Sequence, residues 1–77
     1  MKFNKNDRVR VVKDITNSYE NILGEFGTIK GINCKDNKNY VYFIDCDNNV
    51  GGWSNNQLNI KDGHGISCLE EEIELIK

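Results

Sequence analysis

The sequence predicts an all-β fold, a small barrel of about five strands with a short helical turn before the last strand. Residues 8–11 alternate Arg and Val, the period-two pattern of a strand with one buried face. Residues 24–32 (Gly-Glu-Phe-Gly-Thr-Ile-Lys-Gly-Ile) place glycines inside an aromatic and β-branched stretch, which indicates a bulge or a close backbone approach. Residues 40–44 (Tyr-Val-Tyr-Phe-Ile) form the strongest strand pattern in the chain.

The first two expected strands lie within residues 7–13 and 26–32, and a polar loop over residues 14–24 joins them. In the first strand the valines form the apolar face and the arginines form the charged face. Three apolar side chains are expected to hold the loop against the core: Tyr19, Ile22 and Leu23.

The middle of the chain predicts two further strands. Residues 33–39 are rich in Asn and Lys and predict a hairpin loop, which leads into the strand at 40–44. A turn over residues 45–49 follows, and then a short strand, 50–53, that ends on the only tryptophan. Residues 54–65 are mostly polar and predict a long loop.

Two interpretations fit the end of the chain. Leu69, Ile73 and Ile76 have helical spacing, and Ser67 with Glu70 has the spacing of a capping box. The favoured alternative is a strand over residues 66–69, one helical turn, and a last strand over 73–76. In that alternative Ile73 and Leu75 face the core, and the last strand pairs with the first strand and closes the barrel. Closure would remove the exposed strand edges that invite aggregation.

Length and composition indicate one small binding domain. The 77 residues form a single domain, because chains divide only at roughly 250 residues or more. A core of this size leaves little room for a deep catalytic cleft, whereas a shallow groove or a subunit interface is easily built. The net charge of −2 argues against a protein that relies on neutralising phosphates.

Charge is unevenly distributed along the chain. Residues 1–13 hold five basic side chains and one acid, whereas residues 62–77 hold five acids and one Lys. We expect the two terminal segments to lie side by side and offset each other. The sequence shows no signal peptide and no apolar run long enough to cross a bilayer, and the three cysteines are not closely paired, so a reduced, cytoplasmic location is expected.

These motifs together resemble the short SH3-like barrel proteins of bacteriophages and prophages of low-GC Gram-positive bacteria, and they are also similar to Mind-bomb-type repeat domains. The resemblance rests on five stretches that span most of the chain: 7–12, 27–32, 41–45, 51–53 and 69–76. It implies a non-enzymatic binding module, of the kind that a phage uses to inhibit or sequester a host component. Such proteins often carry a Gly-His near the last strand, as at residues 63–65, and tryptophans before the acidic turn, where this chain has Ser67-Cys68-Leu69 instead.

Metal binding and catalysis have weak support. Cys34, Cys46, His64 and Cys68 could supply four zinc ligands, but the chain lacks the Cys-x₂₋₄-Cys pair that structural zinc sites usually contain. A Cys–His nucleophile needs a thiolate of lowered pKa and an orienting third group, and the sequence shows neither. We therefore expect no enzyme activity, no metal and no cofactor.

The aromatic residues are the best functional candidates. Alternation along residues 40–44 is expected to turn Val41 and Phe43 inward and to leave the two tyrosines outward or half covered, on a strand that neighbours Trp53. Aromatic side chains on one face of a barrel make a groove for a peptide, a base or a planar ligand.

Three functional hypotheses follow. The first is a protein-binding module, or one that self-associates, whose contact residues are Tyr40, Tyr42, Trp53 and His64. The second is a nucleic-acid-associated barrel in which four basic residues contact phosphates: Arg8, Arg10, Lys13 and Lys30. The third is a small-ligand binder, for a nucleotide-like molecule, with a pocket between subunits.

Overall fold

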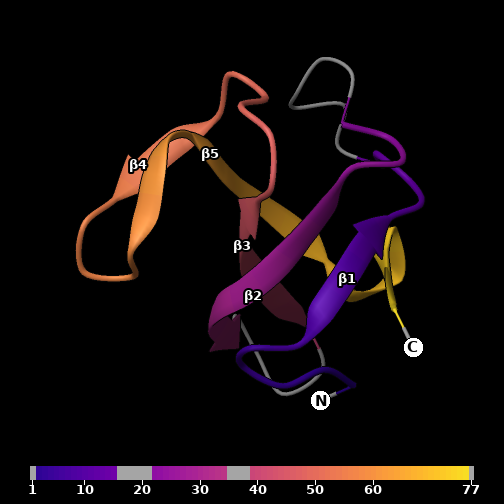
Figure 1. The fold of residues 1–77 in the computed structure, drawn as a ribbon. Coiled ribbons are helices and arrows are strands. Elements are labelled where there is room, and N and C mark those ends of the chain that lie inside the picture. The colour runs from indigo at the N-terminus through magenta and orange to yellow at the C-terminus, as the bar shows by residue number, and fades with distance from the viewer. Residues whose placement is uncertain (1, 16–21, 35–38, 77) are drawn as a thin grey trace.

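The computed structural model describes residues 2–15, 22–34 and 39–76 (Figure 1). Within these residues the chain forms one antiparallel sheet of six strands in the order β4-β5-β3-β2-β1-β6. The strands are β1 (Arg8–Val11), β2 (Phe26–Cys34), β3 (Tyr40–Cys46), β4 (Trp53–Asn55), β5 (Ile60–Leu69) and β6 (Ile73–Leu75). A 3-10 turn, η1 (Glu70–Glu72), separates β5 from β6. The all-β class and the helical turn before the last strand are therefore confirmed.

The sheet does not close into a barrel, so that part of the predicted fold class is wrong. The first and last strands are neighbours as expected, with Val9 opposite Leu75 and Val11 opposite Ile73. The two ends of the sheet, however, are β4 and β6, and no ladder joins them in the described part of the chain. Each of these strands has only three residues.

Residues 54–65, expected to be a loop, instead form most of the β4–β5 hairpin, which Figure 1 shows in orange, standing to one side of β1 and β2. Its turn contains Asn59 at φ 59°, and the Asn55 side chain accepts a hydrogen bond from the Leu58 amide at 3.1 Å. The sequence did not predict this strand because Lys61 and Asp62, next to its start, are polar and exposed. Close backbone packing also requires glycine here, since a Cβ on Gly52 would lie 1.9 Å from the Gly65 carbonyl oxygen.

The predicted orientation of β3 is wrong for Tyr42 and Phe43, whereas Val41 is buried as predicted. Tyr42, Ile44 and Cys46 are buried in the core, whereas Phe43 is only partly buried on the other face. Alternation did not decide between the faces, because both carry large apolar side chains. The pairing decides it: Ile44 lies between Ile29 of β2 and Ile66 of β5, which are both fully buried.

The core lies on one side of the bent sheet and draws on every strand except β4. It also includes Phe3 and Ile22 from outside the strands; the strand members are Val9, Val11, Ile29, Tyr42, Ile44, Cys46, Ile66, Cys68 and Ile73. The predicted loop anchor Ile22 is thus confirmed, whereas Leu23 is 62% exposed and Tyr19 lies outside the described residues. The predicted bulge is present, since the β2–β3 register shifts between Ile29 and Gly31.

The buried carboxylate of Glu72 holds the connection between β5 and β6 in place. Glu72, the last residue of η1, is almost completely buried. Its Oε1 accepts a hydrogen bond from the Leu69 amide at 2.6 Å, and its Oε2 accepts one from the Ile15 amide at 2.8 Å. Its backbone carbonyl accepts hydrogen bonds from Val12 and Lys13. Glu72 thereby joins the end of β5 to the segment that leaves β1.

The last strand, β6, comes directly after Glu72 in the chain and pairs with β1. The predicted pairing of the basic first segment with the acidic last segment is confirmed, because Arg10 lies opposite Glu74. Ile73 is buried as predicted, but the prediction for Leu75 is wrong, since this side chain is 44% exposed at the sheet edge.

Replacing Glu72 with Ala should lower the free energy of unfolding by about 2–4 kcal/mol, because two amides lose their acceptor in a buried place. Glu72→Gln should have a smaller effect, since one oxygen remains. Glu71→Ala, at the exposed neighbouring position, is the matched control and should change stability by less than about 0.5 kcal/mol. Urea unfolding followed by circular dichroism measures all three, and equal effects at 71 and 72 would contradict the assignment.

Candidate binding site on the outer face of the sheet

One row of residues crosses the face of the sheet opposite the core, which we call the outer face. The strand registers place Trp53 opposite Gly65, Gly65 opposite Asp45, Asp45 opposite Thr28, and Thr28 opposite Arg8. Cross-strand partners share a face, with Cβ atoms about 5 Å apart. The row therefore runs from an aromatic ring at β4, through a carboxylate at β3, to an arginine at β1.

An open pocket of about 220 Å³ lies at the aromatic end of this row. The rings of Phe43 and Trp53 meet edge to face, with centroids 5.8 Å apart and an interplanar angle of 79°. The described residues that line the pocket are Phe43, Trp53, Asn55, Leu58 and Ser67. Its wall is thus aromatic and aliphatic, and an amide and a hydroxyl supply polar groups, which is the usual composition of a recognition pocket.

Two glycines shape this pocket. A Cβ on Gly65 would lie 2.5 Å from the Trp53 ring, so the indole occupies the space above the Gly65 backbone. A Cβ on Gly31 would lie 3.2 Å from the Phe43 ring and 3.5 Å from the Leu58 methyl groups. The glycines that the sequence places in strands therefore mark where aromatic rings pack against backbone.

Asp45 lies beside the pocket with an unsatisfied oxygen. It is two residues from Phe43 on β3, so both side chains are on the outer face. Its Oδ1 is buried and has no hydrogen-bond partner among the described residues. Such an oxygen costs about 1–3 kcal/mol when it stays unpaired.

The four predicted contact residues do not form one surface. Tyr42 is fully buried, and its hydroxyl donates to Glu70 Oε2 at 2.7 Å and accepts from the Lys2 and Phe3 amides. It therefore holds the N-terminal segment and η1 together, and the expectation that it points outward is wrong. Tyr40 is partly buried against the core. Trp53 alone is among the residues that line the aromatic pocket.

The Tyr42–Glu70 contact changes the pKa of both groups. Burial, together with the hydrogen bond to Glu70, raises the pKa of the Tyr42 hydroxyl. The same hydrogen bond lowers the pKa of the Glu70 carboxyl. Each shift keeps the phenol neutral and the carboxylate charged near neutral pH, so the contact persists there.

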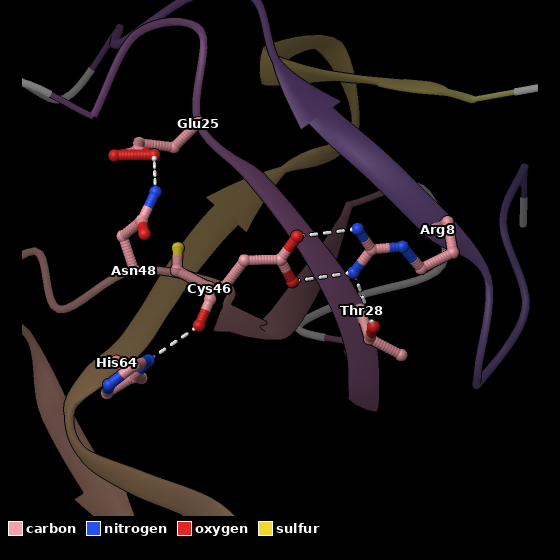
Figure 2. A network of polar contacts seen from close by, with 7 residues as sticks. Arg8, Glu25, Thr28, Cys46, Asn48 and His64 are labelled. Atoms are coloured by element: carbon pink, nitrogen blue, oxygen red, sulfur yellow. Dashed lines mark hydrogen bonds and ion pairs between the residues drawn. The ribbon is translucent and has the colours of Figure 1, made fainter.

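His64 is placed by strand pairing. Its Nδ1 lies 2.7 Å from the Cys46 carbonyl oxygen and donates to it in the matching tautomer (Figure 2). The side chain is partly buried. This contact is structural and joins β5 to the end of β3, and the predicted role of His64 in partner binding stays a prediction.

The basic residues of the nucleic-acid hypothesis are partly engaged with their neighbours. Arg8 forms a bidentate ion pair with Asp47, at 2.6 and 2.7 Å, and also donates to the Thr28 hydroxyl (Figure 2). Arg10 lies over the Phe26 ring, 5.9 Å from its centroid. Lys13 is exposed just beyond β1, and Lys30 is the extra residue of the β2 bulge. Two of the four basic residues, Arg8 and Arg10, therefore already contact other side chains of the protein.

The cysteines do not assemble a reactive or metal-binding centre in the part of the chain that is described. Burial raises the pKa of the Cys46 thiol to about 12, and it also raises the pKa of Cys68, so the thiolate form is disfavoured at both. Cys34 is exposed. No group of three or more His, Cys, Asp or Glu side chains is placed to hold a metal ion among these residues.

A second apolar surface lies at the other end of the sheet. The large apolar side chains that are exposed in the described residues all lie near the β1–β6 end: Val12, Ile15, Leu23, Phe26 and Leu75. We call this set the apolar rim. A hollow of about 400 Å³ lies within it, bounded by residues from β1 and from the segment before β2. The rim and the aromatic pocket are thus separate surfaces.

Two pocket residues lie where the sequence does not predict them. Phe43 is on the outer face and not in the core, and Leu58 lines the pocket from the turn of the β4–β5 hairpin. Asp45 and Ser67 carried no signal, because single polar residues in strands are common on exposed faces. The one available signal was the pair of glycines at positions 31 and 65, which indicate close packing.

Comparisons with protein-family models, with curated proteins and with solved structures find no match. The resemblance to short SH3-like barrel proteins therefore stays a prediction. No helix in the described residues is long and apolar enough to cross a membrane. The site must accordingly be interpreted from its own chemistry.

The Arg8–Asp47 pair should contribute to stability in a pH-dependent way. The hydrogen bond from Arg8 lowers the pKa of Asp47 below its ordinary value of 3.8. A lowered carboxyl pKa stabilises the folded state above the unfolded pKa, and this contribution is lost as pH falls through the folded pKa. Because both side chains are nearly half exposed, Arg8→Gln should cost at most about 1 kcal/mol at pH 7.

Urea unfolding at pH 7 and at a series of acid pH values below 3.8, the ordinary pKa of the carboxyl, tests this, since Asp47 becomes protonated as the pH falls through its lowered folded pKa. The difference between wild type and Arg8→Gln should shrink at acid pH. Arg10→Gln removes the same charge from the same face and should show a smaller change with pH. A difference for Arg8→Gln that persists undiminished at acid pH would contradict the ion-pair assignment.

Proposed function

We propose that this chain is a non-enzymatic module that binds another protein by taking one side chain of a peptide segment into the aromatic pocket. The observation that carries the proposal is the pocket between Phe43, Trp53 and Leu58, with Asn55 and Ser67 at its wall. Aromatic residues are the commonest anchors of protein interfaces. Small-molecule sites usually have about 300–1,000 Å³, so this smaller pocket suits a side chain better than a nucleotide-like ligand.

The chemistry of the remaining residues agrees with a binding role. The raised thiol pKa values of Cys46 and Cys68 disfavour nucleophilic catalysis at these cysteines. The turn before the last strand and the pairing of β1 with β6 support a relation to the SH3-like class, here in an open form. Both points favour a scaffold whose activity resides in its surface.

Nucleic-acid binding has less support. Arg8 is already paired with Asp47, and the chain carries a net charge of −2. Phosphate contacts depend on uncommitted cations and weaken steeply as salt rises. Salt dependence therefore separates the two functions in one binding experiment.

The experiment is a screen of hexapeptides on an array with the labelled wild-type chain, followed by titration of the selected peptides. Trp53 is the only tryptophan, so its emission reports occupation of the pocket in the wild type and in Leu58→Ala, and the attached label reports binding by Trp53→Ala. We expect Trp53→Ala and Leu58→Ala to weaken binding at least about tenfold, as for truncated interface anchors. Lys61→Ala, an exposed substitution on β5, is the control and should leave affinity unchanged.

The result depends on folded variants, so circular dichroism and thermal unfolding accompany each titration. Retention of full affinity in both folded pocket variants would overturn the proposal. Tight binding of a single-stranded oligonucleotide that falls by more than about a hundredfold between 50 and 200 mM salt would favour the nucleic-acid function instead.

Self-association is a second candidate, because a specific surface favours it. The apolar rim adjoins β6, which is an open sheet edge in the described residues. Pairing of β6 with its copy in a second chain would extend the sheet and cover Leu75. Light scattering after size exclusion should then give the mass of a dimer, and Leu75→Lys should shift it to a monomer. A monomeric wild-type chain at high concentration would exclude this candidate.

A further inference from the structure

The aromatic pocket has a charged neighbour that its lining residues do not reveal. Asp45 and Trp53 both lie opposite Gly65, on either side of β5. Gly65 has no side chain, and the Trp53 ring covers its backbone. The Asp45 side chain and the Trp53 indole therefore lie on the same face of the sheet, on the two strands that flank Gly65.

The charge of Asp45 is not neutralised by the nearest arginine in the row. Arg8 directs its two terminal nitrogens to the two oxygens of Asp47 and also bonds Thr28. Asp45 Oδ1 has no hydrogen-bond partner among the described residues. The outer face thus holds an arginine that is paired with Asp47 at β1 and, in the part of the chain that is described, an aspartate with an unpartnered oxygen at β3.

An aromatic wall and a carboxylate attract the same kind of group. The face of an indole ring attracts cations, and the attraction grows when water is excluded. A partly buried carboxylate acts over several ångströms because screening is weak there. The Asp45 Oδ1 atom is covered, so Asp45 attracts a ligand through its charge and not as a direct contact of that oxygen. Anionic ligands are repelled by the same charge.

We propose that the pocket selects a cationic side chain, arginine in preference to lysine, from an extended segment of the partner protein. This inference rests on the proposed binding function and specifies its ligand. The aliphatic stem packs against Phe43 and Leu58, and the guanidinium lies against Trp53 towards Asp45. Arginine is preferred because its planar, weakly hydrated group stacks on aromatic rings.

The first test is the composition of the peptides that bind in a Trp53-dependent manner. These peptides should share an arginine, or less often a lysine, at one anchor position. Replacing that anchor with leucine or glutamate should weaken binding at least about tenfold. An anchor that is apolar or acidic would overturn the cation assignment while leaving the proposed binding function intact. Absence of any Trp53-dependent peptide would overturn both.

The second test removes the charge of Asp45. Asp45→Asn is nearly isosteric and should weaken an arginine-anchored peptide at least about tenfold, with no loss for the leucine-anchored peptide. Glu74→Gln removes the same charge from β6, three strands away in the sheet order, and is the matched control. Equal affinities of wild type and folded Asp45→Asn for the arginine peptide would overturn the role of Asp45.

Discussion

The architecture depends on the buried carboxylate of Glu72. The chain leaves β5, which pairs with β3, and must cross to the free edge of β1, and this crossing occurs within the three residues of η1. Glu72 supplies acceptors at both ends of the crossing, to the Leu69 amide and to the Ile15 amide. Its backbone carbonyl adds the contacts to Val12 and Lys13. A carboxylate satisfied by several amides tolerates burial that an unpaired one would not, so β6 can lie beside β1 and complete the apolar face that Ile73 enters.

The same packing decides where the candidate site lies. Tyr42 can enter the core because its hydroxyl is satisfied by Glu70 and by two N-terminal amides. Once Tyr42, Ile44 and Cys46 occupy the core, the alternation of β3 places Phe43 and Asp45 on the opposite face. There Phe43 meets Trp53, and Asp45 comes to lie beside Gly65. The orientation of β3 therefore determines both which side chains fill the core and which side chains form the outer pocket.

The fold could be predicted in those segments where the sequence pattern fits a single kind of element. Alternation of Val9 and Val11 with arginines fixed the faces of β1, and the glycine at position 31 indicated the bulge. The turn at residues 70–72 followed from the acidic run between two apolar stretches. The site was less predictable, because β3 is apolar on both faces and the start of β5 is polar. Trp53 was identified as a contact residue, whereas Phe43, Leu58 and Asp45 were not.

Local patterns were enough to predict the strand-rich class and the bulge at Gly31, because strand propensity and a period of two are encoded by neighbouring residues. The adjacency of the first and last strands was expected from the opposite charges of the two terminal segments. Three-dimensional packing establishes which face of β3 is buried, that the sheet stays open between β4 and β6, and that an aspartate lies next to the aromatic pocket. These outcomes depend on pairing between strands far apart in the chain, and the register of that pairing is set by burial and hydrogen bonding in three dimensions.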